Sequence, residues 1–141
     1  MQSCRIPPDG SVDVTMALHE SGENYLVAVM LLERTMGEGN VHSADIARYR
    51  KVSRASVCCG MNALKSDGYI VIDEKNAIHL TGAGRKVAKE IDEHHLFFAD
   101  MLMNAGVSSD VAERDACRLE HVISRESFMK LKSKIHDILF T

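Results

Sequence analysis

Three side chains that bind transition metals lie close together near the C-terminal end of the sequence. Cys117, Glu120 and His121 fall within residues 109–122, a stretch whose pattern predicts one continuous helix. Because residues three and four positions apart share a helix face, the thiolate, the carboxylate and the imidazole are expected to point to one spot. Glu113, one turn earlier, reaches the edge of that spot. This donor set suits a divalent transition metal and leaves part of its coordination shell to other segments.

Each of these residues also has a simpler interpretation. A cysteine on a helix face is often a small buried hydrophobic residue, and a lone histidine is often a surface or hydrogen-bonded residue. A second source of donors, His94 and His95 on the preceding predicted helix, favours the metal site. Cys117 and His121 would also suit an enzyme's nucleophile and base, but the sequence shows neither a third orienting group nor a glycine-rich phosphate cradle. We therefore predict a protein that is not an enzyme.

The charge distribution indicates a DNA-binding surface on an otherwise acidic chain. The 141 residues carry a net charge of −3, which alone would argue against a nucleic-acid partner. Residues 46–66, however, contain no Asp or Glu and five basic residues, namely Arg48, Arg50, Lys51, Arg54 and Lys65. A local basic patch of this kind is the electrostatic signature of a nucleic-acid interface.

The composition predicts an aliphatic, methionine-rich core and no membrane-spanning segment. Hydrophobic residues make up 45% of the chain, aromatic residues only 5%, and tryptophan is absent. The longest apolar run, residues 25–32, is far shorter than the roughly 20 residues that cross a bilayer. The first ten residues hold two prolines and no hydrophobic stretch, so we predict no signal peptide and a cytoplasmic location.

Hydrophobic periodicity divides the chain into an N-terminal arm and two folded parts. Residues 1–20 contain a Pro-Pro-Asp-Gly turn and only weak alternation, and are interpreted as the arm. Residues 21–83 predict one helix, two short helices joined by a tight connection, and a β-hairpin, which together form a winged helix-turn-helix. Residues 84–141 predict three helices whose apolar stripes suit packing against one another or a second subunit. The predicted fold class is mainly α with a small β-hairpin.

The second helix of the helix-turn-helix, which begins at Ser53, is the predicted recognition helix. Its exposed N-terminal end is expected to present four side chains to base edges: Ser53, Arg54, Ser56 and Cys59. The other basic residues of this region are expected to contact phosphates, which position a protein without specifying sequence: Arg48, Arg50, Lys51 and Lys65. A redox switch is an alternative role for Cys58 and Cys59, although adjacent cysteines rarely pair within a helix.

Several short motifs follow one another along residues 21–139. They are Asp45-Ile46-Ala47, Val52-Ser53, Ser56-Val57, Gly68-Tyr69-Ile70, Leu80-Thr81 with Gly84, the helix of His95, and the run from Cys117 to Ser124. In this order they resemble the metal-dependent transcriptional repressors of the diphtheria toxin repressor and manganese transport regulator family. The run from Cys117 to Ser124 is the specific part, because many winged-helix families share the helix-turn-helix.

The resemblance implies a winged helix-turn-helix, a helical dimerisation domain and a metal corepressor site between them. By position it assigns the primary ligands Asn24, Cys117, Glu120 and His121, with His95 at a neighbouring metal position and Glu113 near it. It also implies a homodimer that binds a palindromic, double-stranded DNA operator with Fe²⁺ or Mn²⁺ as corepressor. The domains expected on this basis are residues 21–83 for DNA binding and residues 84–141 for metal binding and dimerisation.

Two residues depart from the pattern of this family. Asn24 stands where the family has Met or Asp, and Val27 stands where the manganese branch has Glu. A site with fewer carboxylates suits Mn²⁺ less well, so the sequence favours Fe²⁺, and Cys117 is expected to attract Zn²⁺ or Co²⁺ in vitro. The departures leave one alternative open, namely a winged-helix protein that binds DNA without responding to metal.

Overall fold

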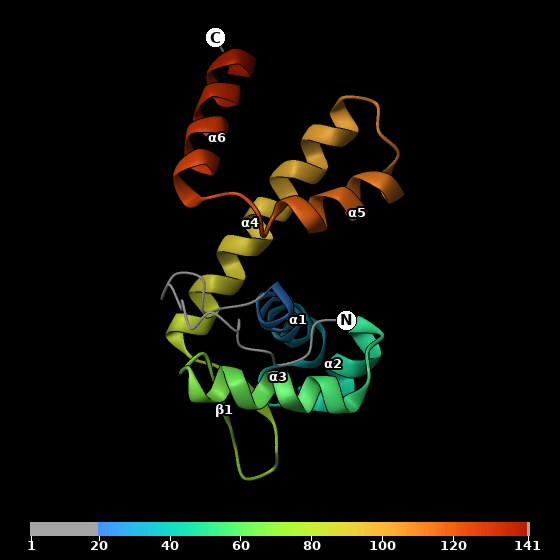
Figure 1. Cartoon of the computed structure of the whole chain (residues 1–141), viewed down its shortest axis with the longest axis vertical. Helices are drawn as coiled ribbons and strands as arrows, with labels where there is room; N and C mark the ends of the chain where they lie inside the picture. The colour runs from blue at the N-terminus through green and yellow to red at the C-terminus, as the bar shows by residue number, and fades with distance from the viewer. Residues whose placement is uncertain (1–19, 141) are drawn as a thin grey trace, which may run out of the picture. The chain divides into compact units, whose positions relative to one another are not determined.

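The computed structural model describes residues 20–140, with side chains for residues 21–137. These residues form six α-helices and one β-hairpin (Figure 1), which confirms the predicted fold class. In chain order the elements are α1 (Glu20–Met36), α2 (Ser43–Arg50), α3 (Arg54–Ser66), β1 (Ile70–Ile72), β2 (Ile78–Leu80), α4 (Gly82–Asn104), α5 (Ser109–Leu119) and α6 (Arg125–Phe140). The predicted arm lies outside the described residues, apart from Glu20 at the start of α1.

The chain divides into two compact units between Lys89 and Glu90, inside α4. The first unit holds α1, α2, α3, the hairpin and the first turns of α4. The second unit holds the rest of α4 together with α5 and α6. Among the described residues, no helix has the length and apolar character needed to span a membrane.

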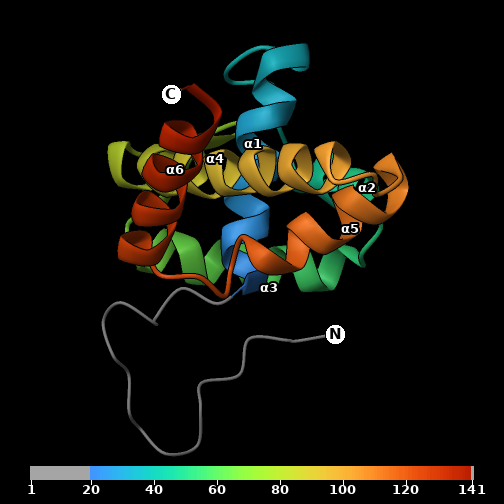
Figure 2. The same cartoon turned by 90° about the horizontal axis from the view of Figure 1, so that it is seen from above.

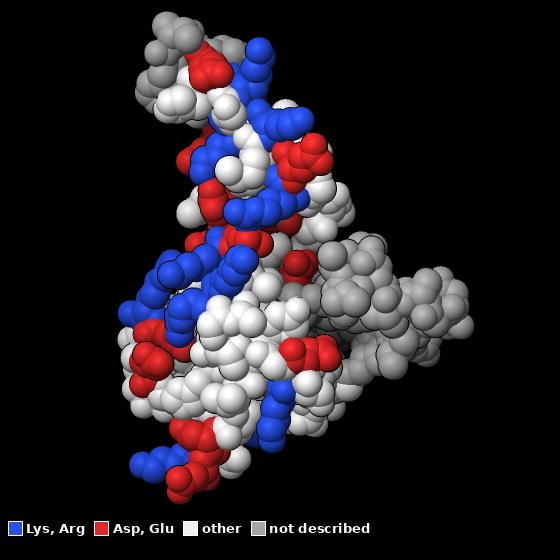
Figure 3. Space-filling model, turned by 90° about the vertical axis from the view of Figure 1, so that its left-hand side faces the viewer, with Lys and Arg blue, Asp and Glu red and all other residues white. Residues whose placement is uncertain are grey.

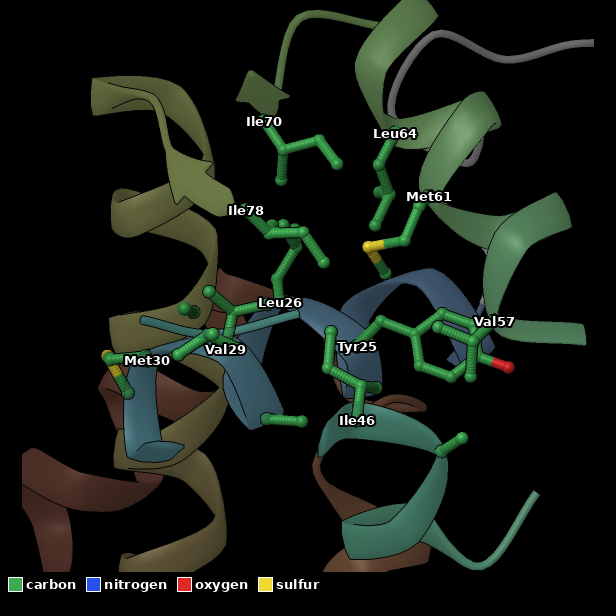
Figure 4. Packing of buried hydrophobic residues seen from close by; sticks show 14 residues of the cluster. Tyr25, Leu26, Val29, Met30, Ile46, Val57, Met61, Leu64, Ile70 and Ile78 are labelled. Atoms are coloured by element: carbon green, nitrogen blue, oxygen red, sulfur yellow. The ribbon is translucent and has the colours of Figure 1, made fainter. Parts of the chain in front are cut away.

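An aliphatic core organises the first unit. Leu26 and Val29 of α1 are fully buried in one cluster with Ile46 of α2, Met61 of α3 and Ile78 of β2 (Figure 4). Helix α1 lies across α3 (Figure 2). Each of the two helices contributes one apolar face to the same cluster. The periodic apolar positions of the sequence therefore meet here, as a 3.6-residue repeat predicts.

Two glycines allow close approaches within the first unit. A Cβ atom on Gly60 of α3 would lie 2.4 Å from the ring of Tyr25, and one on Gly84 of α4 would lie 2.0 Å from the carbonyl oxygen of Tyr69. Separations this short are sterically forbidden, so a side chain at either position would displace its neighbour. Thr81 adds polar contacts at the start of α4, because its hydroxyl donates to the Gly68 carbonyl and accepts from the Gly84 amide.

Helices α2 and α3 form the predicted helix-turn-helix. The connection turns at Lys51, whose φ is 57° and whose N–H donates to the Ala47 carbonyl. Ser53 then caps α3, since its hydroxyl oxygen accepts a hydrogen bond from the Ser56 amide. The turn and the cap together place α3 directly after α2, in the position expected of a recognition helix.

The β-hairpin forms the predicted wing. Its strands are antiparallel, with Val71 opposite His79, and the hairpin projects past α3 (Figure 1). Asp73 organises its turn by accepting hydrogen bonds from the Lys75 and Ala77 amides, and its second oxygen lies 2.8 Å from Nε2 of His79. The contact with His79, followed by the amide hydrogen bonds, holds the pKa of Asp73 below its usual value.

The second unit has a much smaller apolar core. Phe98, Ala99, Ala116 and Phe128 are its clustered buried residues, contributed by α4, α5 and α6. Basic and acidic side chains intermingle at the level of α6 (Figure 3), where Lys132 pairs with Glu93 at 2.5 Å and Arg125 pairs with Glu90. Apolar packing and surface ion pairs thus both hold α4, α5 and α6 together.

Candidate metal centre

Metal-binding side chains from α4 and α5 meet inside the second unit. Nδ1 of His95 lies 2.8 Å from Oε2 of Glu120, and the ligand atoms of His95, Cys117 and Glu120 all lie within 4.8 Å of one another. The side chain of Glu120 is only 4% exposed. The packing of α4 on α5 therefore brings His95 to Cys117 and Glu120, which follow it by more than 20 residues.

His121 lies at the other oxygen of the same carboxylate. Its Nε2 is 3.1 Å from Oε1 of Glu120, and its side chain is 3% exposed. The prediction that one continuous helix reaches this residue is wrong, because α5 ends at Leu119 and Glu120 is the C-cap. The reason is local. The Val122 N–H donates a hydrogen bond to the Leu119 carbonyl, three residues back, and this bond closes a turn in place of a further helical turn.

Glu113 lies at the edge of the cluster, as the sequence predicts. Its Oε2 is 2.5 Å from Nε2 of His95, and its side chain is 57% exposed. Both ring nitrogens of His95 therefore face carboxylate oxygens, one from Glu113 and one from Glu120. Glu113 can adjust to a ligand more freely than Glu120, because solvent surrounds most of its side chain.

The protonation of the cluster follows from these contacts. Hydrogen bonds with Cys117, then Glu120 and Glu113, raise the pKa of His95 to about 11, although burial acts in the opposite direction. Burial alone would raise the pKa of Glu120, but its hydrogen bonds with His121 and His95 bring it below the usual value. A divalent cation and a proton would therefore compete for the same ring nitrogen of His95, and binding of the cation would release the proton.

The donor chemistry of the cluster fits a divalent transition metal. His95, Cys117 and Glu120 bring an imidazole, a thiol and a carboxylate together, and His121 adds a second imidazole at the other oxygen of that carboxylate. This mixed set suits Fe²⁺, Co²⁺ or Zn²⁺ better than a hard cation that prefers oxygen ligands. His95, Cys117, Glu120 and His121 are the residues of the second unit that would hold the ion. Asn24 belongs to α1 of the first unit, where it is half-buried. Its assignment to this site comes from the family resemblance and stays a prediction.

The predicted DNA-contacting residues lie on α2, on α3 and in the turn between them. Exposed among them are Arg48, Lys51, Ser53, Arg54 and Lys65, whereas Arg50, Ser56 and Cys59 are half-buried. Cys58, which the sequence analysis did not select for DNA contact, is exposed and carries a free thiol. The two adjacent cysteines are therefore not bonded to each other.

Residue type alone does not separate His94 from its neighbour His95, and the assignment of His95 as the ligand came from the family resemblance. In the structure His94 is buried, at 7% exposure, and its Nδ1 lies 3.2 Å from the carbonyl oxygen of Glu120. Helical phase is the signal that distinguishes the two histidines, because Ile91 and Phe98, three residues before and four after His94, are also buried.

Comparison with known proteins shows which protein family this chain resembles in sequence. The family described as "Iron dependent repressor, metal binding and dimerisation domain" matches residues 81–140. The chain is 31% identical over 105 residues to the transcriptional regulator MntR of Escherichia coli O6:H1, a match covering 74% of this chain and 66% of that protein. It is 30% identical over 104 residues to the HTH-type transcriptional regulator MntR of Geobacillus kaustophilus, covering 74% and 72% respectively. The chain thus spans just under two thirds of the Escherichia coli regulator.

Solved structures share the fold of the chain. The manganese regulator SloR superimposes with a TM-score of 0.73 at 22% identity, covering 82% of this chain and 53% of that chain. IdeR of T. acidophilum superimposes with a TM-score of 0.66 at 24% identity, covering 80% of this chain and 53% of that chain. At these identities the likeness establishes the fold.

Proposed function

Because the chain belongs to the diphtheria toxin repressor and manganese transport regulator family of metal-dependent repressors, we propose that it is a cytoplasmic transcriptional repressor of metal homeostasis with Fe²⁺ or Mn²⁺ as corepressor. The observation that carries this proposal is the convergence of His95, Cys117 and Glu120, whose ligand atoms lie within 4.8 Å of one another. The matched relatives are transcriptional regulators, which supports a function other than catalysis.

The ligands that we assign to the metal come from both units. They are Asn24 of α1, His95 of α4, and Cys117, Glu120 and His121 at the end of α5, with Glu113 at the edge. When bound, a divalent cation supplies the positive charge that balances a thiolate and a carboxylate held close together. Asn24 would contribute a neutral amide oxygen from the first unit. A metal held by both sets of side chains would couple the two units, which is the corepressor role that we propose.

The first unit supplies the DNA-binding residues of the proposal. Ser53, Arg54, Ser56 and Cys59, near the start of α3, are assigned to base edges, and Arg48, Arg50, Lys51 and Lys65 to phosphates. In a two-fold dimer the two recognition helices must lie about 34 Å apart, or a multiple of this distance, to enter successive major grooves. An ordered joint between the units favours that spacing, so metal affinity and operator affinity are coupled.

A homodimer is supported by apolar side chains that the second unit leaves exposed. The large ones on its surface are Leu96, Met103, Val111, Leu119, Val122, Met129 and Leu131. Seven of the ten large apolar side chains exposed among the described residues thus lie in this unit, as a surface that binds a second copy requires. We therefore assign residues 84–141 to metal binding and dimerisation and residues 21–83 to DNA binding.

Operator binding with and without metal tests this function. A random duplex library selected in the presence of Co²⁺, which the donor set suits, supplies a DNA ligand, and fluorescence anisotropy then gives its affinity. We expect metal to tighten binding roughly 5- to 150-fold, which corresponds to a coupling of about 1 to 3 kcal/mol. Glu120→Gln should abolish this gain, whereas Glu126→Gln should retain it, because the Glu126 side chain is 78% exposed and pairs with Lys130 at the surface.

A second candidate function rests on the residues that α1 presents. Asn24 brings no charge, and Val27 packs against the apolar core of the first unit instead of offering a carboxylate. A chain that binds DNA constitutively would use the same winged helix without a metal response. Equal operator affinity with and without metal would support this candidate and remove the corepressor role.

A further inference from the structure

His94, immediately before the metal-site residue His95, links three helices of the second unit. Its Nδ1 lies 3.2 Å from the carbonyl oxygen of Glu120, just past the end of α5. Its ring packs on Phe128 of α6, with ring centroids 4.1 Å apart. Because a carbonyl oxygen only accepts hydrogen bonds, Nδ1 must carry the hydrogen and donate it.

The carbonyl that His94 holds belongs to the peptide group between two assigned ligands, Glu120 and His121. A peptide group is planar, so its orientation sets the directions in which both residues leave it. Helix α5 has already ended at Leu119, and its regular hydrogen bonds no longer fix the chain beyond Glu120. The contact with His94 therefore acts where the backbone is least constrained by the helix.

We propose that His94 is a positioning residue of the metal centre, which fixes the Glu120–His121 peptide plane and thereby aims both donor side chains. With this plane held, Oε2 of Glu120 lies 2.8 Å from His95 and Oε1 lies 3.1 Å from His121. Two consecutive histidines of α4 thus hold the same residue, one by its backbone and one by its carboxylate. The inference rests on the proposed metal site and adds to it a residue that does not touch the ion.

Three variants separate positioning from packing. His94→Phe keeps an aromatic ring against Phe128 and removes the donor. His94→Asn keeps an N–H donor near the position of Nδ1 and removes the ring. Phe97→Leu is the matched packing control, because Phe97 lies edge-on to Phe128 at 5.2 Å and takes no part in the hydrogen bond from His94.

The first measurement is the affinity of the full chain for Co²⁺. The d–d and thiolate-to-cobalt absorption bands report this binding. We expect His94→Phe to weaken Co²⁺ binding about 10- to 100-fold, as found for residues that orient metal ligands, and to alter the band intensities. His94→Asn should retain the affinity and spectrum of the parent chain. Phe97→Leu should lower the thermal midpoint and leave the spectrum unchanged.

Amide hydrogen exchange of His121 is the second measurement, made without metal. Because this amide belongs to the held peptide group, His94→Phe should speed its exchange, whereas Phe97→Leu should not. Unchanged Co²⁺ affinity and spectrum in His94→Phe would overturn the inference, and so would unchanged His121 exchange. If His94→Phe does not fold, His94→Asn is compared with His94→Ala, and equal Co²⁺ affinities of these two would overturn it.

The parent chain separates this inference from the proposed function. Absence of Co²⁺ binding by the parent chain would refute the metal site itself. In that case the exchange rate of the His121 amide in His94→Phe still decides whether His94 holds the peptide plane.

Discussion

The two units of this chain are stabilised by different kinds of interaction. In the first unit, a continuous aliphatic cluster includes residues from α1, α2, α3, both strands and α4. In the second unit, the clustered apolar core consists of Phe98, Ala99, Ala116 and Phe128, and two polar residues, His94 and Glu120, are buried beside it. Buried polar groups are favourable only when they are paired. The stability of the second unit therefore depends more strongly on what its polar side chains bind.

This difference fits the proposed function, in which the first unit binds DNA and the second unit binds the metal. A densely packed aliphatic unit can present α3 to DNA in a fixed shape. A unit whose interior contains His95, Cys117 and Glu120 can change its local stability when those side chains gain a ligand. The comparison predicts that substitutions and ligands will act on the two units unequally.

The largest expected effect is the loss of a core side chain from the first unit. Leu26 is fully buried, so Leu26→Ala should lower the free energy of unfolding by about 2 to 5 kcal/mol. Urea denaturation followed by circular dichroism measures this change. Val71→Ala is the control, because Val71 is 52% exposed and should change stability by less than about 0.5 kcal/mol. Similar small values for both variants would show that the first unit is not held by its core.

Metal addition should stabilise the second unit by a comparable or smaller amount. Co²⁺ at about 100 times its dissociation constant should add about 2.7 kcal/mol, seen as slower amide exchange in α5. Amides of α2 and α3 should change much less, since their core is already apolar. Glu120→Gln should remove the effect and Glu126→Gln should not. Equal protection of α3 and α5 would contradict the proposed difference between the units.

Substitution of the recognition helix should affect DNA binding alone. Arg54 is exposed in the first turn of α3, so Arg54→Ala should weaken binding to the selected duplex by about 1 to 3 kcal/mol. Lys65→Ala should instead reduce the dependence of affinity on salt, as loss of a phosphate contact does. Neither variant should change Co²⁺ affinity. A change in Co²⁺ affinity as large as the change in DNA affinity would break the separation of roles.

The smallest expected effect is the pH dependence of the wing. Hydrogen bonds lower the pKa of Asp73 below 3.8 in the folded chain, so the ionised carboxylate favours the folded turn. Its contribution is complete above the unfolded pKa and disappears as the pH falls through the lower, folded pKa. NMR shifts of the Ala77 amide should report this loss below about pH 4. Asp73→Asn should remove the transition, whereas Glu74→Gln, which alters an exposed neighbour, should leave it in place.

The sequence alone determined the elements of this protein and most of its ligand types. Apolar periodicity predicted the helix-turn-helix, because Val57, Met61 and Leu64 recur at helical spacing and are all buried. The β-branched residues around the wing turn predicted the hairpin for an equally local reason. Short-range spacing also placed Cys117 and Glu120 on one face, since residues three apart on a helix are neighbours in any fold.

The tertiary structure decided which distant residues meet. Only the packing of α4 against α5 brings His95 to Cys117 and Glu120, because sequence periodicity identifies a buried face but not its partner. The same packing seats His94 on the carbonyl of Glu120. These contacts depend on long-range geometry and on the compensation of buried polar groups, and neither is encoded in the local pattern of residues.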